Sequence, residues 1–99
     1  MWYAIIGNDR KDSLEARMAA RPAHVARLEI LRDAGRLKLD GPFPAIDAED
    51  PGPSGFSGSL IVAEFSSLAE ARAWADLDPY LAAGVYASVD VRPLRVTLP

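Results

Sequence analysis

The chain has 99 residues, of which 49% are hydrophobic and 25% are charged, and its formal net charge is −3. These values are ordinary for a globular protein and exclude a largely disordered chain. Basic residues are scattered, so we expect no nucleic acid and no membrane surface as a partner. Cysteine is absent, which excludes disulfides and thiolate chemistry. We expect one domain over residues 1–99 and a cytoplasmic location, because no apolar segment is long enough to cross a bilayer.

The first part of the chain predicts a strand followed by a long helical segment. Trp2–Gly7 is rich in aromatic and β-branched residues, which is typical of a strand. Residues 14–34 carry apolar side chains at helical spacing, and Gly35 follows as a C-terminal stop. Pro22 lacks the N–H that a helix interior needs, so we expect a short helix, a break, and then a longer helix. The expected buried stripe is Leu14, Met18, Val25, Leu28 and Leu31.

A short strand and a long loop are expected next. Arg36–Gly41 alternates polar and apolar residues, which is the period of a half-buried strand, and Pro42 is expected to close it. Residues 42–57 are dense in proline, glycine and acidic residues, which indicates a loop. A loop of this length is either a cover over a binding site or a simple hairpin excursion.

The last part of the chain repeats the strand–helix–strand pattern. Gly58–Phe65 is apolar enough for a central strand, and Leu68–Leu77 is expected to be helical. Pro79–Ala83 predicts one further helical turn. Val85–Leu98 reads as a final strand, in which Pro93 indicates an edge position, a bulge or a bend. The stripe expected to be buried on the second helix is Leu68, Ala71, Trp74 or Ala75, and Leu77.

The order β-α-β-β-α-β predicts an α+β, ferredoxin-like fold with a four-stranded antiparallel sheet and both helices on one face. The strands carry apolar residues on both sides, most clearly at residues 60–63. Leaving the uncovered face in water would cost about 25 cal/mol per Å² of apolar surface. We therefore expect a homodimer in which the open sheet faces pack together, a dimeric α/β barrel.

His24 is the only histidine in the chain, and Asp78 is the carboxylate with which we expect it to pair. A neighbouring carboxylate fixes the tautomer of a histidine, so the two side chains would form a general acid/base unit. Each residue also has a purely structural interpretation. A histidine at the edge of an apolar helix face is commonly a packed residue with one hydrogen bond. An aspartate immediately before a proline is a favourable helix N-cap.

Other kinds of site find little support in the residues. One histidine and no cysteine argue against a zinc site, and the acidic residues of the loop do not have calcium-loop spacing. Neither a nucleophile elbow nor a phosphate-binding loop is present. We therefore expect no metal and no cofactor.

Several motifs, spread in order over nearly the whole chain, resemble the YCII-related family. They include Asp12-Ser13-Leu14-Glu15-x-Arg17, Arg21-Pro22-Ala23-His24-x-x-Arg27-Leu28, Gly35-Arg36-Leu37, Gly41-Pro42, Asp50-Pro51-Gly52, Gly55-Phe56-x-Gly58-Ser59, Ala63-Glu64-Phe65 and Ala73-Trp74-Ala75-Asp76-x-Asp78-Pro79-Tyr80-x-x-Ala83-Gly84-Val85-Tyr86. The resemblance implies a dimeric α+β barrel whose active site is built on a histidine of the first helix and the aspartate of the Asp-Pro-Tyr motif. Those positions are His24 and Asp78. The matching motifs also imply that Gly41, Ser59 and Tyr80 line the pocket.

Three functional hypotheses follow. The first is a cofactor-free lyase, isomerase or dehalogenase-like enzyme that acts on a small oxygenated or aromatic molecule, with Arg21 pairing with an anionic substrate group. A distant member of the resembled family is similar in using a His–Asp pair to eliminate chloride from a chlorinated hydroxyquinol. The second is a dimeric module that binds a small ligand, or regulates a partner, without chemistry. The third is a structural dimer in which His24 and Asp78 only pack and cap.

Overall fold

The computed structural model describes residues 1–99 and shows the predicted order of elements. The elements are β1 (Trp2–Asp9), α1 (Leu14–Asp33), β2 (Leu37–Pro44), the 3-10 helix η1 (Gly52–Ser54), β3 (Phe56–Glu64), α2 (Leu68–Asp76), α3 (Pro79–Ala82) and β4 (Tyr86–Leu94). This arrangement confirms the α+β fold with its β-α-β-β-α-β order. None of the helices combines the length and the apolar character that spanning a membrane requires.

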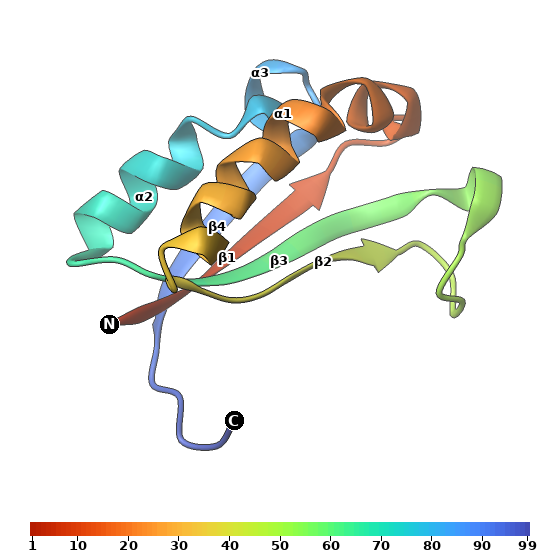
Figure 1. The fold of residues 1–99 in the computed structure, drawn as a ribbon. Coiled ribbons are helices and arrows are strands. Elements are labelled where there is room, and N and C mark those ends of the chain that lie inside the picture. Colours follow the sequence, from red (N-terminus) through yellow and green to blue (C-terminus); the bar gives the residue numbers. More distant parts are fainter.

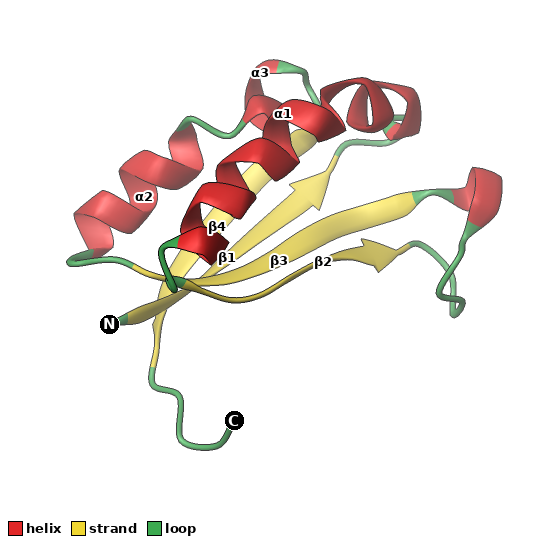
Figure 2. Cartoon of the chain, viewed as in Figure 1, coloured by secondary structure: helices red, strands yellow, loops and turns green.

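The four strands form one antiparallel sheet in the order β2-β3-β1-β4. Both long helices lie on the same face of this sheet (Figures 1 and 2). Pro42, Pro44 and Pro93 lie inside the two edge strands, β2 and β4. Edge strands tolerate proline because a missing N–H there removes no bond to a second neighbour. The expectation that Pro42 closes the strand was therefore wrong, and the loop shortens to residues 45–55.

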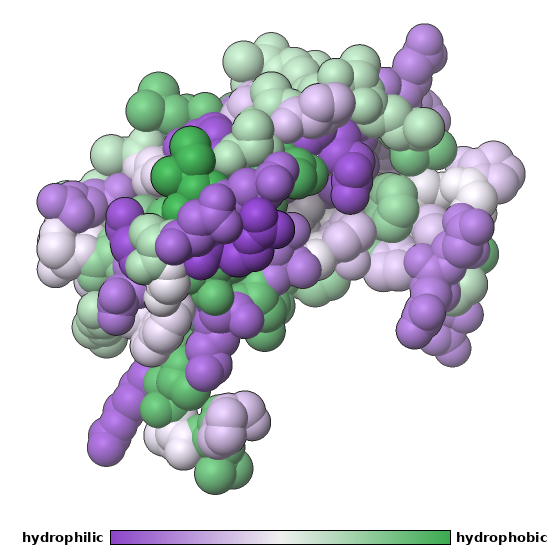
Figure 3. Space-filling view, in the orientation of Figure 1, coloured by the Kyte–Doolittle hydropathy of each residue, from purple (hydrophilic) through white to green (hydrophobic).

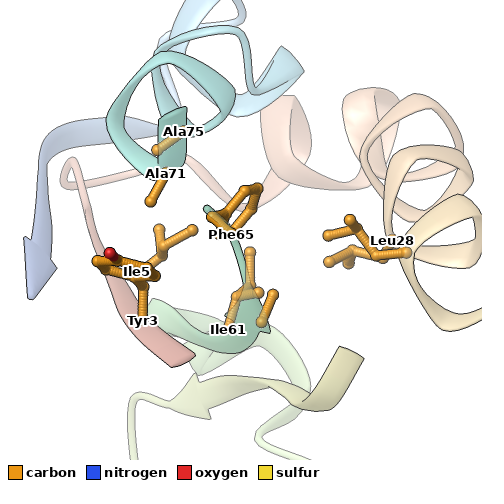
Figure 4. Packing of buried hydrophobic residues seen from close by; sticks show 9 residues of the cluster. Tyr3, Ile5, Leu28, Ile61, Phe65, Ala71 and Ala75 are labelled. Carbon is orange, nitrogen blue, oxygen red and sulfur yellow. The ribbon is translucent and has the colours of Figure 1, made fainter. Parts of the chain in front are cut away.

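The hydrophobic core lies between the sheet and the helices, and it follows the alternation of the two central strands. Tyr3 and Ile5 of β1 pair with Ala63 and Ile61 of β3, and all four side chains point toward the helices. Phe65 packs among them, edge-on to Tyr3 (Figure 4). The buried members of this core are Tyr3, Ile5, Leu28, Leu31, Ile61, Ala63, Phe65, Ala71 and Ala75.

The opposite face of the sheet is covered by no helix. Trp2, Ala4 and Ile6 of β1 point to this side, opposite the core residues in the alternation. The C-terminal segment leaves β4 on the same side (Figure 1) and lines a hollow with Leu39 and Val62. Part of that segment is apolar surface at the lower edge of the molecule (Figure 3). An apolar face is therefore available for a partner.

Two helix expectations were wrong. Pro22 does not break the first helix, which runs without interruption from Leu14 to Asp33. A proline inside a helix costs about 3 kcal/mol, because it removes one hydrogen bond and its ring crowds the preceding turn. The packing of this 20-residue helix against β2 and α3 outweighs that cost. The expected stripes were also partly wrong, because Met18 is 66%, Leu68 is 46% and Leu77 is 75% exposed. Arg17, not Met18, takes the buried position on its turn of α1, and Leu77 lies one residue beyond the end of α2.

Candidate functional site

Most of the polar side chains that the fold buries lie in one cluster. Five polar or charged residues are buried, and four of them, Arg17, His24, Ser59 and Asp78, are joined by contacts among themselves or through one tyrosine. Burial of a polar group costs free energy unless it is hydrogen-bonded. A concentration of such groups in one place, away from the hydrophobic core, therefore marks a candidate site.

His24 and Asp78 meet as the sequence predicted. Nδ1 of His24 lies 2.9 Å from one carboxylate oxygen of Asp78 and 3.0 Å from the other. A carboxylate only accepts hydrogen bonds, so Nδ1–H donates to Asp78 and Nε2 of the neutral ring carries the free lone pair. Nε2 has no hydrogen-bond partner in the chain, although His24 is only 5% exposed. The ring is therefore fixed at one nitrogen and free to react at the other.

Asp78 also has the structural role that the sequence offered as an alternative. Its side chain accepts a hydrogen bond from the backbone N–H of Tyr80 at 2.9 Å and so caps α3, with Pro79 in the first turn. Because a carboxylate has several acceptor positions, capping and pairing with His24 hold at the same time. The cap fixes the carboxylate relative to α3, and the carboxylate in turn fixes the imidazole on α1.

The ring of Tyr80 packs against the face of the His24 imidazole. The two rings are stacked with centroids 3.9 Å apart and an interplanar angle of 10°. Tyr86 meets Tyr80 edge-on at 5.4 Å, and its own ring lies directly over Gly7, where any Cβ would overlap it. The glycine in β1 therefore leaves space for the ring that supports Tyr80. This chain of aromatic contacts restricts the tilt of His24.

Arg17 forms the far side of the cluster, and its role was missed in the sequence. Its guanidinium makes two hydrogen bonds to Asp9, at 2.9 and 3.0 Å, and also donates to Ser59 Oγ at 2.8 Å and to the Gly58 carbonyl. It lies over the Tyr80 ring at 4.7 Å from the centroid. Arg17 precedes His24 by seven residues, which is two helical turns on one face. That spacing is the signal that could have identified it.

The charges of the cluster are set by burial and by their partners. Burial opposes the charge on Arg17, but the hydrogen bond and the charge of Asp9 outweigh it, so the pKa of Arg17 lies above its usual value. Burial raises the pKa of Tyr80, and the positive charges of Arg17 and Arg21 oppose that rise. Tyr80 is therefore a neutral phenol that stacks between a permanent cation and an imidazole.

The other residues predicted for the site are Ser59, Arg21 and Gly41, and the structure places only some of them with His24 and Asp78. Ser59 is in the cluster through its bond to Arg17. Arg21 is exposed, one turn before His24 on α1, and forms no ion pair. Gly41 pairs with Leu60 in the register of β2 and β3 and so points to the uncovered face of the sheet. The structure therefore does not place Gly41 with His24, whereas its neighbour Asp40 does point toward the helices.

The residue types that bind metals are not gathered in this fold. No group of three or more histidine, cysteine, aspartate or glutamate side chains lies close enough together to hold a metal ion. The reactive groups that the cluster itself supplies are the imidazole, the carboxylates, the tyrosine and the guanidinium of Arg17. A buried, oriented imidazole with a free Nε2 is suited to accept a proton from a bound molecule and to return it.

Comparison with known proteins decides the family. Residues 1–95 match the family defined by the YCII-related domain. The chain belongs to the YCII-related domain family. It is 57% identical over 95 residues to protein YciI of Escherichia coli O6:H1, covering 96% of this chain and 97% of that protein. It is 47% identical over 95 residues to an uncharacterized protein of Haemophilus influenzae, with the same coverage.

A solved structure shares the fold of this YCII-related chain. It is the 5-chloro-2-hydroxyhydroquinone dehydrochlorinase of Burkholderia phenoliruptrix AC1100, in complex with 2,5-dihydroxybenzoquinone. The TM-score is 0.83 with 27% sequence identity, and the match covers 96% of this chain and 94% of the other. That protein therefore carries a small cyclic, oxygenated ligand on the same architecture.

Proposed function

We propose that this protein is an enzyme that moves a proton on a small oxygenated aromatic or quinonoid molecule, with His24 and Asp78 as its acid–base pair. The observation that carries the proposal is the geometry of the histidine. Both oxygens of Asp78 hold Nδ1, and Tyr80 holds the face of the ring, while Nε2 has no partner. Such orientation of a base accounts for rate factors of about 10²–10⁴ in general acid–base catalysis.

The proposed chemistry is an elimination or an isomerisation. Nε2 of His24 accepts a proton from the substrate, and the electron pair of the broken bond moves into the ring system, where it expels a leaving group or shifts a double bond. Asp78 stays ionised, keeps the ring in one tautomer, and stabilises the imidazolium that forms. The imidazolium then returns its proton to the product or to solvent.

Charges around the pair support an anionic or electron-rich substrate. Arg21 is a free guanidinium on the same helix, and Arg17 adds a second positive charge behind Tyr80. Guanidinium groups bind carboxylates through two parallel hydrogen bonds, and they donate charge-assisted hydrogen bonds to a single anionic oxygen as well. We propose that Arg21 receives the anionic oxygen of the substrate, and that Tyr80 and Ser59 shape the pocket.

The first test uses the molecules on which the structural neighbour is known to act or which it binds. The protein is incubated with 5-chloro-2-hydroxyhydroquinone, and chloride release is followed against a blank without protein and against His24→Gln. We expect release above the blank with the wild type only. In parallel, 2,5-dihydroxybenzoquinone is added to labelled protein, and we expect the His24 ring signals to move in the NMR spectrum.

Two results would contradict the enzyme proposal. If 2,5-dihydroxybenzoquinone moves the His24 signals but no chloride is released, the protein is a binding module for such molecules. If neither response occurs, the site does not take this class of molecule at all.

We also propose a homodimer through the uncovered face of the sheet. The apolar residues that point to this side, among them Ile6 and Leu60, are half-buried in a single chain. A second copy would bury them by packing the same face against itself, as a two-fold interface requires. We expect sedimentation to give twice the mass of one chain, and Leu60→Lys to give a monomer. The control Leu77→Lys changes an exposed leucine on the helical side and should leave the mass unchanged; a monomeric wild type would contradict the proposal.

A further inference from the structure

A bulge in β2 places an additional carboxylate on the helix-covered face of the sheet. Leu37 pairs with Ala63, but Leu39 pairs with Val62, so Lys38 is an extra residue in the ladder. In a regular strand Asp40 would point to the opposite face from Leu37. After the extra residue it pairs with Ile61 and shares the face of Leu37. Bulges of this kind redirect a side chain, commonly near functional sites.

The bulge brings Asp40 against α1, at the part of the helix that directly follows His24. Asp40 and Leu37 line a hollow of about 140 Å³ with residues of α1. Val25, which follows His24 directly, and Leu28, one turn after it, form the helix side of the hollow. Glu29 and Arg32 complete the lining at the end farther from His24. Asp40 therefore approaches the same helix face as His24, but from the sheet.

The charges that act on Asp40 are those of the candidate site. They are His24, Arg17 and Arg21 on α1, and Asp78 at the start of α3. Asp40 is an exposed residue, yet partial loss of hydration beside α1 raises the pKa of its carboxyl, and the charges of Arg17, Arg21 and the protonated form of His24 oppose this rise. Asp40 forms no hydrogen bond and no ion pair with these groups. It therefore has no structural role as their partner.

We propose that Asp40 is a second acid–base residue of this site, which faces the reacting atoms from β2 while His24 faces them from α1. This inference rests on the proposed function. It adds a residue that donates a proton to the substrate while His24 accepts one from it. Nε2 of His24 accepts a proton from the substrate, and the electron pair moves to another atom. Asp40, in its acid form, donates a proton to the atom or leaving group that becomes negative. The pair ends as imidazolium and carboxylate, so the number of protons is unchanged.

The first test requires no substrate. Aspartate side chains are labelled with ¹³C, and each carboxyl is titrated by NMR in the wild type and in His24→Gln. We expect the pKa of Asp40 to lie above the ordinary aspartate range and to rise further when His24 and its attractive charge are removed. Asp33 is the internal control, since it is exposed and lies nine residues beyond His24, roughly 13 Å along the helix. An Asp40 that titrates like Asp33 and does not respond to His24 overturns the inference.

Stability gives a second measurement that distinguishes a functional carboxylate from a structural one. A carboxyl whose pKa is raised on folding favours the folded state below its unfolded pKa, and this contribution is lost as the pH rises through the folded value. Asp40→Asn is therefore expected to have a higher Tm than the wild type at pH 7, and the difference should vanish near pH 3. A lower Tm at pH 7 would show that Asp40 supports the fold, which contradicts the inference.

Turnover of 5-chloro-2-hydroxyhydroquinone separates this inference from the proposed function. With an active wild type, we expect Asp40→Asn to lower kcat about 10²-fold or more with little change in KM. Asp40→Glu should restore part of kcat, because it returns an acid to the same strand. An unchanged kcat in Asp40→Asn overturns the role of Asp40 and leaves that of His24 intact. If the wild type is inactive, the proposed function fails, and the titration alone decides whether Asp40 belongs to the site.

Discussion

Replacing His24 with glutamine is expected to reduce turnover about 10²–10⁴-fold while the protein stays folded. The imidazole is the only group in the cluster with a free, oriented nitrogen, and glutamine cannot accept and release a proton in its place. Chloride release from 5-chloro-2-hydroxyhydroquinone gives kcat and KM, and thermal unfolding shows whether the fold is kept. The loss should fall on kcat, since the variant keeps Arg21 and Tyr80, the residues that we propose contact the substrate.

Asp78→Asn is the matched variant for this experiment. Asparagine caps a helix about as well as aspartate, so α3 should keep its start at Pro79. The amide, however, can donate to Nδ1 and so favours the wrong tautomer of His24, with the hydrogen on Nε2. We expect a loss of kcat comparable to that of His24→Gln. Wild-type kcat in both variants would show that the pair has a structural role only.

Asp9→Asn is expected to destabilise the fold by about 3–5 kcal/mol, because it leaves the guanidinium of Arg17 buried without its counter-charge. The side chains of Arg17 and Asp9 are only 6% and 2% exposed, so water cannot replace the lost partner. A domain of this size is stable by only about 5–15 kcal/mol. The free energy of unfolding from urea denaturation measures the effect.

Two further variants test the cause of that loss. Asp76→Asn removes the partner of Arg72 in an exposed pair on α2, and it should cost about 1 kcal/mol or less. The double variant Asp9→Leu/Arg17→Met removes both charges, and it should be more stable than Asp9→Asn, since no charge is left unpaired. If Asp9→Asn and Asp76→Asn unfold at the same urea concentration, Arg17 does not depend on Asp9.

Local signals in the sequence were sufficient to predict the order of helices and strands and to identify His24 and Asp78. The periods of two and 3.6 residues separate strands from helices because they depend only on neighbouring positions. Gly35 after α1 and Asp78 before Pro79 define helix ends for the same reason, and the structure confirms both. His24 was identifiable because it is the single histidine on a helix face that also carries Leu28 and Leu31.

The rest of the site was decided only by the tertiary structure. Arg17 reads as a surface residue until Ser59, 42 positions away, and Asp9 supply its hydrogen bonds. The stacking of Tyr80 on His24 depends on how α1 and α3 are placed, which no local pattern encodes. Asp40 belongs to the polar side of its strand by alternation, and only the pairing of β2 with β3 reveals the bulge that turns it around.

The sequence by itself therefore determined the α+β fold, the family resemblance and the pairing of His24 with Asp78. Whether Pro22 breaks a helix, or Leu77 is buried, was decided by the tertiary structure, because both depend on the surfaces that other elements provide. The same holds for the charges that surround His24. The charge of each group depends on its hydrogen-bond partners and on how much hydration it loses, and both are set by residues from distant positions in the chain. The sequence identifies the ionisable residues but not these surroundings.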